Sequence, residues 1–476
     1  MPSIPISNAA GGGDQPRTQG ILRRALAIAL VACLPAVSAS QQPGSTSLVT
    51  SAMDASTRRD TTQTLGPRLS LETIIARTLV HSPAVAGAVG AVRDASAARL
   101  AAVGAYLPSL VLTGITGRSN QSATTTGSAT DATAATTAPV QTTYGAGVAA
   151  LVDVFTDGRR GAQLRQATAV GRAATAGLVL QRYATIFTGT QGYLDVLRAH
   201  ELTRVAADQL AQASLGLDYV LRRQAAGTAM TADVLSAQLA VSTARQAQLA
   251  ASDTLNMTAA ALGRLVGASG PVDAETTATV EPTPLVLSDA AIVSLAVATS
   301  PAVLTTEALA GADTAAVRAA KTFYVPTIAA GAGYNWANRS SFVGGLRLGW
   351  IVELTTSFPI FDGFVREQVI TQAEVASDVA SVTALDTRRL VGASAVQLLG
   401  NLHVAEHDIE LARESVRLAT ENLRVFRLRY NAGIATILDV LTAQTSLIQA
   451  ELSLVSARFH YQSTRAALEA LLGRTL

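Results

Sequence analysis

The sequence has only one cysteine, Cys33, and aromatic residues make up only 4% of its 476 residues. A single cysteine has no partner for a disulfide within the chain, and a chain of this length can build a core without one. Hydrophobic residues nonetheless reach 49%, so the apolar content is mainly Ala, Leu and Val. This composition favours long, closely packed helices and argues against large aromatic pockets.

An excess of charge of one sign is also missing, because 36 basic residues are balanced by 34 acidic ones and the charges are scattered. No basic patch typical of nucleic-acid binding is present, so we expect no nucleic-acid partner. The sequence has no G-x-S-x-G, Walker or dinucleotide-binding motif. Beyond the N-terminal leader it has no run of about 18 apolar residues, so we expect any membrane crossing to use β-strands.

The N-terminus resembles an export signal. Three arginines precede an apolar run over residues 25–37, and small residues follow up to Ala39. This pattern predicts a signal peptide over residues 1–39 and an exported chain, with an extended segment over 40–68. An alternative stays open, because the four residues ending at Cys33 resemble a lipobox, which would make Cys33 a lipidation site and the mature N-terminus.

The remainder of the chain contains two similar halves. The helix-to-strand joints Leu107-Pro108-Ser109 and Val325-Pro326-Thr327 are 218 residues apart, and Gly227 and Gly433 are 206 apart. These matches predict two structural repeats, residues 69–286 and 287–476. A Ser/Thr/Ala/Gly-rich tract from Ser119 to Thr143 has no counterpart in the second half, so we expect a long flexible loop there.

Each half is predicted to contain two strands, over about 109–155 and about 326–361. Apolar and polar residues alternate there, with Trp336 and Trp350 on the apolar face. Strands of roughly ten residues fit a tilted crossing of a bilayer, with the tryptophans in an aromatic girdle. Four strands cannot close a barrel, so the chain would have to oligomerise, and three copies would supply about twelve strands. A soluble antiparallel sheet that packs one face on helices is the alternative.

The helical pattern is equally regular. A short helix from Leu71 ends near His81, and Ser82-Pro83 restarts it with an N-cap serine and a proline at the first helical position. Proline-free tracts from about Arg159 to Ala226 and from about Arg366 to Ala432 predict helices of about 100 Å. Return helices are predicted over 231–266 and 437–472. Within the second long tract, apolar residues such as Val416, Leu423 and Phe426 recur at mixed intervals of three and four, which is typical of coiled-coil packing.

These features together resemble a known family. The duplicated plan, Leu107-Pro108-Ser109, Phe361-Asp362-Gly363, and Tyr430-x-x-Gly433 followed by Asp439-Val440-Leu441 are similar to the TolC-like outer-membrane efflux proteins, or outer membrane factors. The resemblance extends from about Leu69 to Leu476. It implies a mixed α/β membrane protein. Its fold would be a homotrimer with a twelve-stranded antiparallel β-barrel, four strands per chain, continued by a long α-helical coiled-coil barrel.

The resemblance also implies a function. Such a protein is a passive export duct in the outer membrane of a Gram-negative-type cell, projects into the periplasm and contacts outer-membrane lipid. It works with a periplasmic adaptor (membrane fusion) protein and an inner-membrane pump, in tripartite efflux or type I secretion. We therefore expect no enzymatic activity, no cofactor and no metal.

The same resemblance suggests a periplasmic gate formed by Asp233, Asp439 and Tyr430, beside helix-hairpin turns at Gly227 and Gly433. Two positions depart from the family pattern, since Ala435 and Thr442 stand where other members have an arginine and a second aspartate. The gate is therefore expected to be held more loosely here.

The gate residues have simple structural explanations as well. Gly227 and Gly433 suit helix C-caps, and Asp439, three residues after Thr436, suits a capping box. In a symmetric trimer both roles are compatible, because three copies of Asp439 around one axis would repel each other and attract cations.

Two other classes of protein share features with this sequence. His403-Val404-Ala405-Glu406-His407 has the H-x-x-E-H spacing of one class of zinc peptidases, but it lies in a helix rich in Glu and Arg, where a solvated face is the simpler interpretation. A periplasmic coiled-coil adaptor or scaffold without a pore would keep the long helices. Such an adaptor or scaffold would not need strands with an apolar face.

Overall fold

A computed structural model describes residues 66–119, 141–156, 158–275, 285, 287–324, 326–338 and 346–476. The chain divides into two units, Met1–Thr62 and Gln63–Leu476, and all described residues belong to the second. The predicted signal peptide, Cys33 and most of the predicted loop lie outside the described residues.

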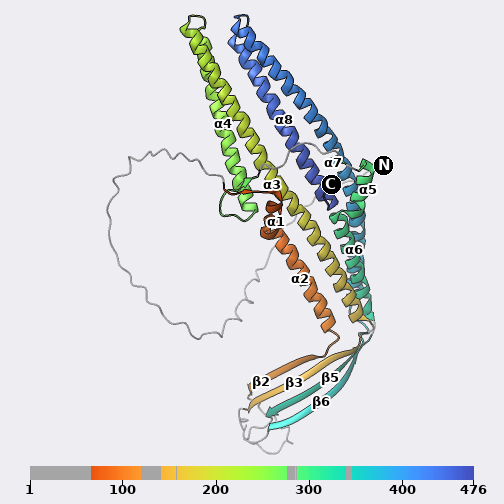
Figure 1. The fold of residues 1–476 in the computed structure, drawn as a ribbon. Coiled ribbons are helices and arrows are strands. Elements are labelled where there is room, and N and C mark those ends of the chain that lie inside the picture. Colours follow the sequence, from red (N-terminus) through yellow and green to blue (C-terminus); the bar gives the residue numbers. More distant parts are fainter. Residues whose placement is uncertain are drawn as a thin grey trace, which may run out of the picture. The chain divides into compact units, whose positions relative to one another are not determined.

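The same order of elements occurs twice along the chain (Figure 1). In each half two helices lead into two strands, and a very long helix and a shorter one follow. The first half comprises α1 (Leu71–His81), α2 (Pro83–Gly104), β2 (Ser109–Ser119), β3 (Gln141–Phe155), α3 (Arg159–Ala225) and α4 (Thr231–Leu265). The second comprises α5 (Asp289–Thr299), α6 (Pro301–Ala320), the 3₁₀ turn η1 (Lys321–Tyr324), β5 (Thr327–Asn338), β6 (Leu346–Ser357), α7 (Val365–Asn431) and α8 (Ile437–Leu472).

The joint between α1 and α2 follows the prediction. The side chain of Ser82 accepts the backbone N–H of Val85 at 3.4 Å, and Pro83 occupies the first turn of α2, where its missing N–H leaves no bond unmade. Ser300 and Pro301 repeat the joint between α5 and α6, although there the serine side chain caps no backbone N–H.

The expectation that no helix could cross a membrane needs correction. Among the described residues, the tract Asp289–Ala320 is long and apolar enough to do so by length and composition alone, since an 18-residue window within it has a mean hydropathy of 1.5. The pair α1 and α2 passes only if the two helices, which meet at 54°, count as one span. In the chain α5 packs against α7, and α6 packs against α3 and α7.

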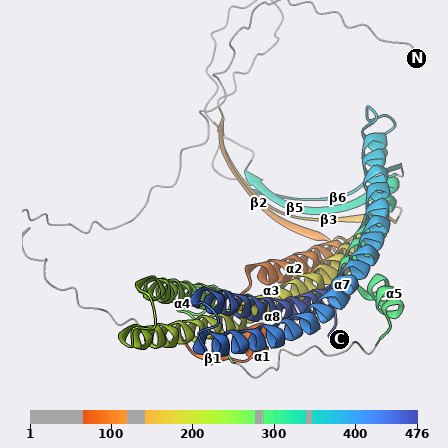
Figure 2. The ribbon, with the colours of Figure 1, turned by 90° about the horizontal axis from the view of Figure 1, so that it is seen from above.

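The four strands form one antiparallel sheet in the order β2-β3-β5-β6 (Figure 1), and Figure 2 shows that the strands are curved. Trp336 lies opposite Leu348, and Tyr334 lies opposite Trp350. Because directly opposed residues share a face, the predicted apolar residues of β5 and β6 lie on one face of the sheet. Trp350 on this face is 77% exposed, so no helix in the described part of the chain covers it, whereas a soluble sheet would need such cover.

Strand β3 ends in an irregularity that alternation along one strand does not predict. The register against β5 is regular up to Asp153, but it shifts between Asp153 and Phe155, and Phe155 pairs with Ile328. A β-bulge of this kind inserts one extra residue, here Val154, so the alternation is out of phase beyond it. Phe155 therefore shares the face of Ile328.

The two longest helices, α3 and α7, each have 67 residues, which at the usual rise gives about 100 Å. Their N-caps have left-handed backbones, at Gly158 (φ +74°) and Phe364 (φ +68°). Phe364 is the only residue other than glycine with positive φ in the described part of the chain. The sheet and the hairpin turns lie at opposite ends of these helices (Figure 1).

One pairing was not predicted. β1 (Arg68–Leu69) and β4 (Asp273–Ala274) form a two-stranded parallel sheet. It joins the N-terminal end of the described chain to the segment that follows α4.

Candidate functional site

The two helical hairpins end in turns with the same backbone hydrogen bonds. After α3, the N–H of Gly227 bonds to the carbonyl of Gln224 at 2.9 Å, and the N–H of Thr228 bonds to that of Arg223 at 2.9 Å. Residues 429–434 repeat this pattern after α7. Both are Schellman motifs, which require a left-handed residue; Gly227 (φ +73°) and Gly433 (φ +75°) supply it.

The two predicted gate aspartates sit at the beginnings of the return helices. A carboxylate oxygen of Asp439 accepts the backbone N–H and the hydroxyl of Thr436, both at 2.8 Å, while the N–H of Asp439 donates to the threonine hydroxyl at 3.3 Å. The Thr436–Asp439 capping box is therefore confirmed. The bonds from Thr436 lower the pKa of the Asp439 carboxyl. Asp233 accepts the N–H of Met230 at 3.0 Å in the same way.

Tyr430, at the end of α7, packs against two residues of α3. The guanidinium of Arg223 donates to the backbone carbonyl of Tyr430 at 2.8 Å and lies 4.8 Å from the centre of its ring. The ring of Tyr219 packs against it at 5.8 Å and 59°. Arg223 thus links the first hairpin to the second by a hydrogen bond and a cation–π contact.

The phenol of Tyr430 is buried, with only 7% of the residue exposed, and its hydroxyl has no hydrogen-bond partner. Burial raises the pKa of Tyr430, the charge of Arg223 opposes this, and Asp233 raises it further. The charge of Asp233 therefore acts on Tyr430. The hydrogen bonds of Asp439, in contrast, stay within its own turn.

A hydrophobic cluster surrounds this contact. Val220 and Val234 of the first hairpin and Leu423, Ile437 and Val440 of the second are buried in it together with Tyr430. Burying a side chain of this size stabilises the fold by about 1.5–3 kcal/mol. The two hairpins are thus held together at their tips mainly by apolar packing, with Arg223 at its edge.

Sequence reasoning missed Arg223 and Tyr219. A signal for Arg223 existed, because both halves carry an arginine four residues before the turn glycine, at Arg223 and Arg429. A cation in the last turn of a helix also suits the helix dipole. Ala435, which replaces the arginine of the family pattern, packs against the apolar cluster, and Thr442 donates to the carbonyl of Leu438 at 2.9 Å.

The H-x-x-E-H pattern lies on an exposed face of α7. His403 pairs with Asp289 of α5 at 3.0 Å, and its other ring nitrogen lies 3.6 Å from Glu406, while His407 pairs with Glu410. The hydrogen bond that His403 donates to Asp289 raises the pKa of His403. Among the described residues no three His, Cys, Asp or Glu side chains are placed to hold a metal ion.

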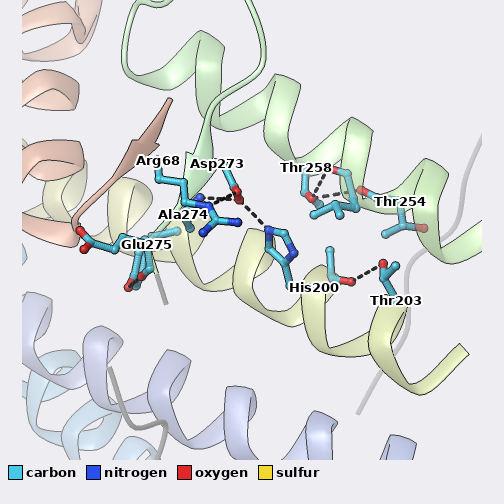
Figure 3. A network of polar contacts seen from close by, with 11 residues as sticks. Arg68, His200, Thr203, Thr254, Thr258, Asp273, Ala274 and Glu275 are labelled. Atoms are coloured by element: carbon cyan, nitrogen blue, oxygen red, sulfur yellow. Dashed lines mark hydrogen bonds and ion pairs between the residues drawn. The ribbon is translucent and has the colours of Figure 1, made fainter. Parts of the chain in front are cut away.

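The sequence also provided no indication of a polar cluster around Asp273 (Figure 3). The side chain of Asp273 in β4 is only 3% exposed; its oxygens lie 3.1 Å from Nε of Arg68 and 2.5 Å from Nε2 of His200. One oxygen also accepts the N–H of Ala274 at 2.8 Å. Because a buried carboxylate needs such partners, Asp273 ties β1 and β4 to helix α3.

Comparisons with known proteins agree on one group. The family model described as "Outer membrane efflux protein" matches residues 74–268 and 292–474. Protein CyaE of Bordetella pertussis is 29% identical over 310 residues, which cover 62% of this chain and 64% of the relative. Outer membrane protein TolC of Escherichia coli is 28% identical over 122 residues, which cover 26% of this chain and 25% of TolC. The chain thus matches less than two thirds of the length of these curated relatives.

A solved structure extends the likeness to nearly the whole fold. The outer membrane protein VceC of Vibrio cholerae superimposes with a TM-score of 0.69 over 85% of this chain and 96% of that chain, at 20% identity. At this identity the likeness concerns the fold.

Proposed function

The chain belongs to the outer membrane efflux protein family, and we propose that it is the outer-membrane channel of a tripartite efflux or type I secretion system. It is an outer-membrane protein that extends into the periplasm. In this function it is a passive duct from the periplasm to the exterior. The observation that carries the proposal is a sheet with an uncovered apolar face, continuous with helices of about 100 Å.

The sheet supports a barrel made of several copies. Its four strands leave β2 and β6 as free edges, and unpaired backbone groups cannot remain exposed to lipid. Pairing β6 of one copy with β2 of the next would satisfy both edges, and three copies would close about twelve strands. The exposed apolar face would then contact the outer-membrane lipid.

The helices support a periplasmic tube. α3 packs along α4, and α7 packs along α8, yet Leu239, Leu411 and Leu438 stay more than half exposed on these helices. In a trimer, neighbouring hairpins would cover such residues, as coiled-coil packing requires. The repeated element order suggests that the two hairpins arose by internal duplication, which would let similar surfaces alternate around the tube.

The hairpin tips would form the gate. Around a threefold axis, three copies each of Asp233 and Asp439 would narrow the entrance and favour cations. Closing the gate would bring these like charges together, and attractive contacts would have to offset their repulsion. The Arg223–Tyr430 contact and the apolar tip cluster are the contacts available in each chain.

Partners would supply energy and selectivity. A passive duct would depend on an inner-membrane pump for both energy and selectivity, and a periplasmic adaptor would connect the duct to the pump. The proposal therefore includes an adaptor and a pump, and it names no particular cargo.

The test is single-channel conductance of the detergent-extracted protein in a planar bilayer, with its mass in detergent. We expect a trimer with discrete, cation-selective openings. Replacing Asp233 and Asp439 by Ala should raise conductance or lower cation preference, and unchanged currents would refute the aspartate gate alone. A water-soluble chain without channel activity would instead favour the alternative, a periplasmic coiled-coil scaffold without a pore.

A further inference from the structure

The face of the sheet opposite the tryptophans carries an apolar row of its own. Successive residues of a strand point to opposite faces, so this second face would line the lumen of the proposed channel. Val111 of β2 pairs with Ala149 of β3. Ala149 pairs in turn with Gly333 of β5, which pairs with Ile351 of β6. The row therefore crosses all four strands without a polar side chain.

The large side chains of this row are open to solvent. Val111 is 50% exposed and Ile351 is 53% exposed. Leu151 lies on the same face, two residues after Ala149, and is also half exposed. We call Val111, Ala149, Leu151 and Ile351 the inner belt. The neighbouring rows on this face do contain polar residues, among them Thr113, Asn335 and Glu353.

Glycines of β5 leave room for the larger side chains of β6. A Cβ atom on Gly333 would come within 3.1 Å of Cγ2 of Ile351, and one on Gly331 within 3.0 Å of Oε1 of Glu353. Both larger side chains therefore lie over a glycine of the neighbouring strand. Glycine in a strand often marks a place where another group approaches the backbone closely. The wall is thin at the inner belt, and its apolar surface stays accessible.

The width of the proposed barrel decides what the inner belt can do. Twelve strands about 4.8 Å apart and tilted by about 40° would enclose a backbone diameter of about 24 Å. Side chains on the wall cannot close such a width, so the inner belt would not act as a hydrophobic constriction that gates by dewetting. It would instead be an apolar patch on the wall, past which cargo moves through water.

A carboxylate lies beside the inner belt. Glu353 is exposed and follows Ile351 by two residues on the same face, about 7 Å along the strand, whereas Arg347 precedes it by four, about 14 Å. Screening at physiological salt acts over about 8 Å, so the nearer carboxylate dominates at the belt. Asp153, the other acidic residue of the four strands, already lies 3.9 Å from Arg159. An apolar patch with a negative charge at its edge is complementary to a molecule that combines a hydrocarbon part with a positive charge.

We propose that the inner belt and Glu353 form a subsite for amphiphilic organic cations on the inner wall of the barrel. The hydrocarbon part of the cation lies on the inner belt, and its positive charge lies near the carboxylate. Three copies of the chain supply three such subsites around the lumen. Because the lumen stays open, each contact is partial and binding is weak, as passage through a channel requires. The proposal rests on the channel function proposed above.

The experiment measures block of single-channel current by two cations of equal charge, with the full-length protein in planar bilayers. Tetramethylammonium has no hydrocarbon tail, whereas hexyltrimethylammonium carries a linear hexyl chain. Each methylene removed from water changes affinity by up to about fourfold, so partial cover of the tail predicts half-block by hexyltrimethylammonium at a concentration at least about tenfold lower. Equal block by both cations would overturn the proposal.

Two adjacent positions of β6 provide a matched pair of variants. The double variant Val111→Thr and Ile351→Thr keeps β-branched side chains, which suit strands, but makes the inner belt polar. We expect it to keep its unit conductance, which shows that the pore has formed, and to lose most of the preference for hexyltrimethylammonium. Val352→Thr makes a similar change one residue further along, on the face of the tryptophans. We expect this control to leave the preference unchanged.

A further variant tests the carboxylate. Glu353→Gln removes the charge at nearly constant size, so block by both cations should weaken by a similar factor and the preference for the longer one should remain. Unchanged block by both cations would overturn the part assigned to Glu353.

The outcomes separate the subsite from the channel itself. If the preference survives in the double threonine variant, the hydrocarbon tail binds elsewhere and the subsite is refuted. If Val352→Thr removes the preference to the same extent, the tail acts from the lipid, which refutes the subsite as well. In both cases discrete openings would leave the channel function standing. Absence of openings in the unchanged protein would instead refute the channel function, and the subsite with it.

Discussion

Replacing Arg223 by Ala tests how the two hairpins are held together. The substitution removes a charged hydrogen bond to the carbonyl of Tyr430 and a cation–π contact with its ring. A hydrogen bond to a charged group contributes about 1.5–3 kcal/mol, and an exposed cation–π contact about 0.5–1 kcal/mol. Because Arg223 is only partly buried, we take a combined value near the lower limits, about 2 kcal/mol.

This value predicts a large change in gating. Every 1.4 kcal/mol is about a tenfold change in an equilibrium, so losing the contact favours the open state by about 30-fold for each protomer in which opening breaks it. We expect the open probability of Arg223→Ala channels in planar bilayers to rise steeply, with unchanged unit conductance. Arg223→Lys should have an intermediate effect, since it keeps the charge but not the planar fork.

The neighbouring residue provides a matched control. Arg222 lies on the same turn of α3, but among the described residues its ion pair is with Asp218, four residues earlier on an exposed surface. Such surface pairs contribute little, so Arg222→Ala should leave the open probability nearly unchanged. If Arg223→Ala behaves like Arg222→Ala, the Arg223–Tyr430 contact does not hold the hairpins together and the reasoning fails.

Three further predictions follow from the same structure. Tyr430→Phe should be nearly neutral at pH 7, because the hydroxyl has no partner. The raised pKa of Tyr430 means that its contribution to stability is complete below pH 10.0 and is lost as the pH rises above that value. An unfolding titration should show a smaller alkaline loss in the variant, and identical curves would contradict this. Gly433→Ala should lower the free energy of unfolding by about 1 kcal/mol, because the backbone at Gly433 is left-handed. Gly216→Ala within α3 should instead raise it by about 0.5–1 kcal/mol. Shifts of the same sign in the melting temperatures of the two variants would refute the argument. Asp273→Asn should destabilise the fold by about 2 kcal/mol and speed proteolysis after β1, because one buried carboxylate oxygen becomes an N–H₂ group that cannot accept from Arg68 or from His200; unchanged cleavage would show that the cluster does not hold β1.

Much of the fold could be predicted because its signals are local and repeated. The predicted bounds of α3, α4, α7 and α8 differ from the observed ones by at most one residue. The Ser82-Pro83 cap and the Thr436–Asp439 capping box involve residues at most three apart, so residue types alone indicate them. Of the candidate site, the sequence indicated the turns and their glycines; the gate role of Asp233, Asp439 and Tyr430 stays a prediction.

The contacts that were missed join residues far apart in the chain. Arg223 and Tyr430 are separated by 207 residues, and Arg68 and Asp273 by 205. β1 and β4 have two residues each, which is too short for any periodic signal. The bulge at Val154 depends on how β3 meets β5, and alternation within one strand cannot reveal it.

The sequence by itself determined the elements of this protein, because helix length, strand alternation, caps and turns each depend on residues close together in the chain. Only the tertiary structure decided which charges meet, which tyrosine is buried without a hydrogen-bond partner, and that Phe364 keeps a left-handed backbone and an exposed ring. The physical reason is that periodicity fixes which face of an element is apolar. The partner of that face is chosen by packing, register and the need to pair buried polar groups across long loops.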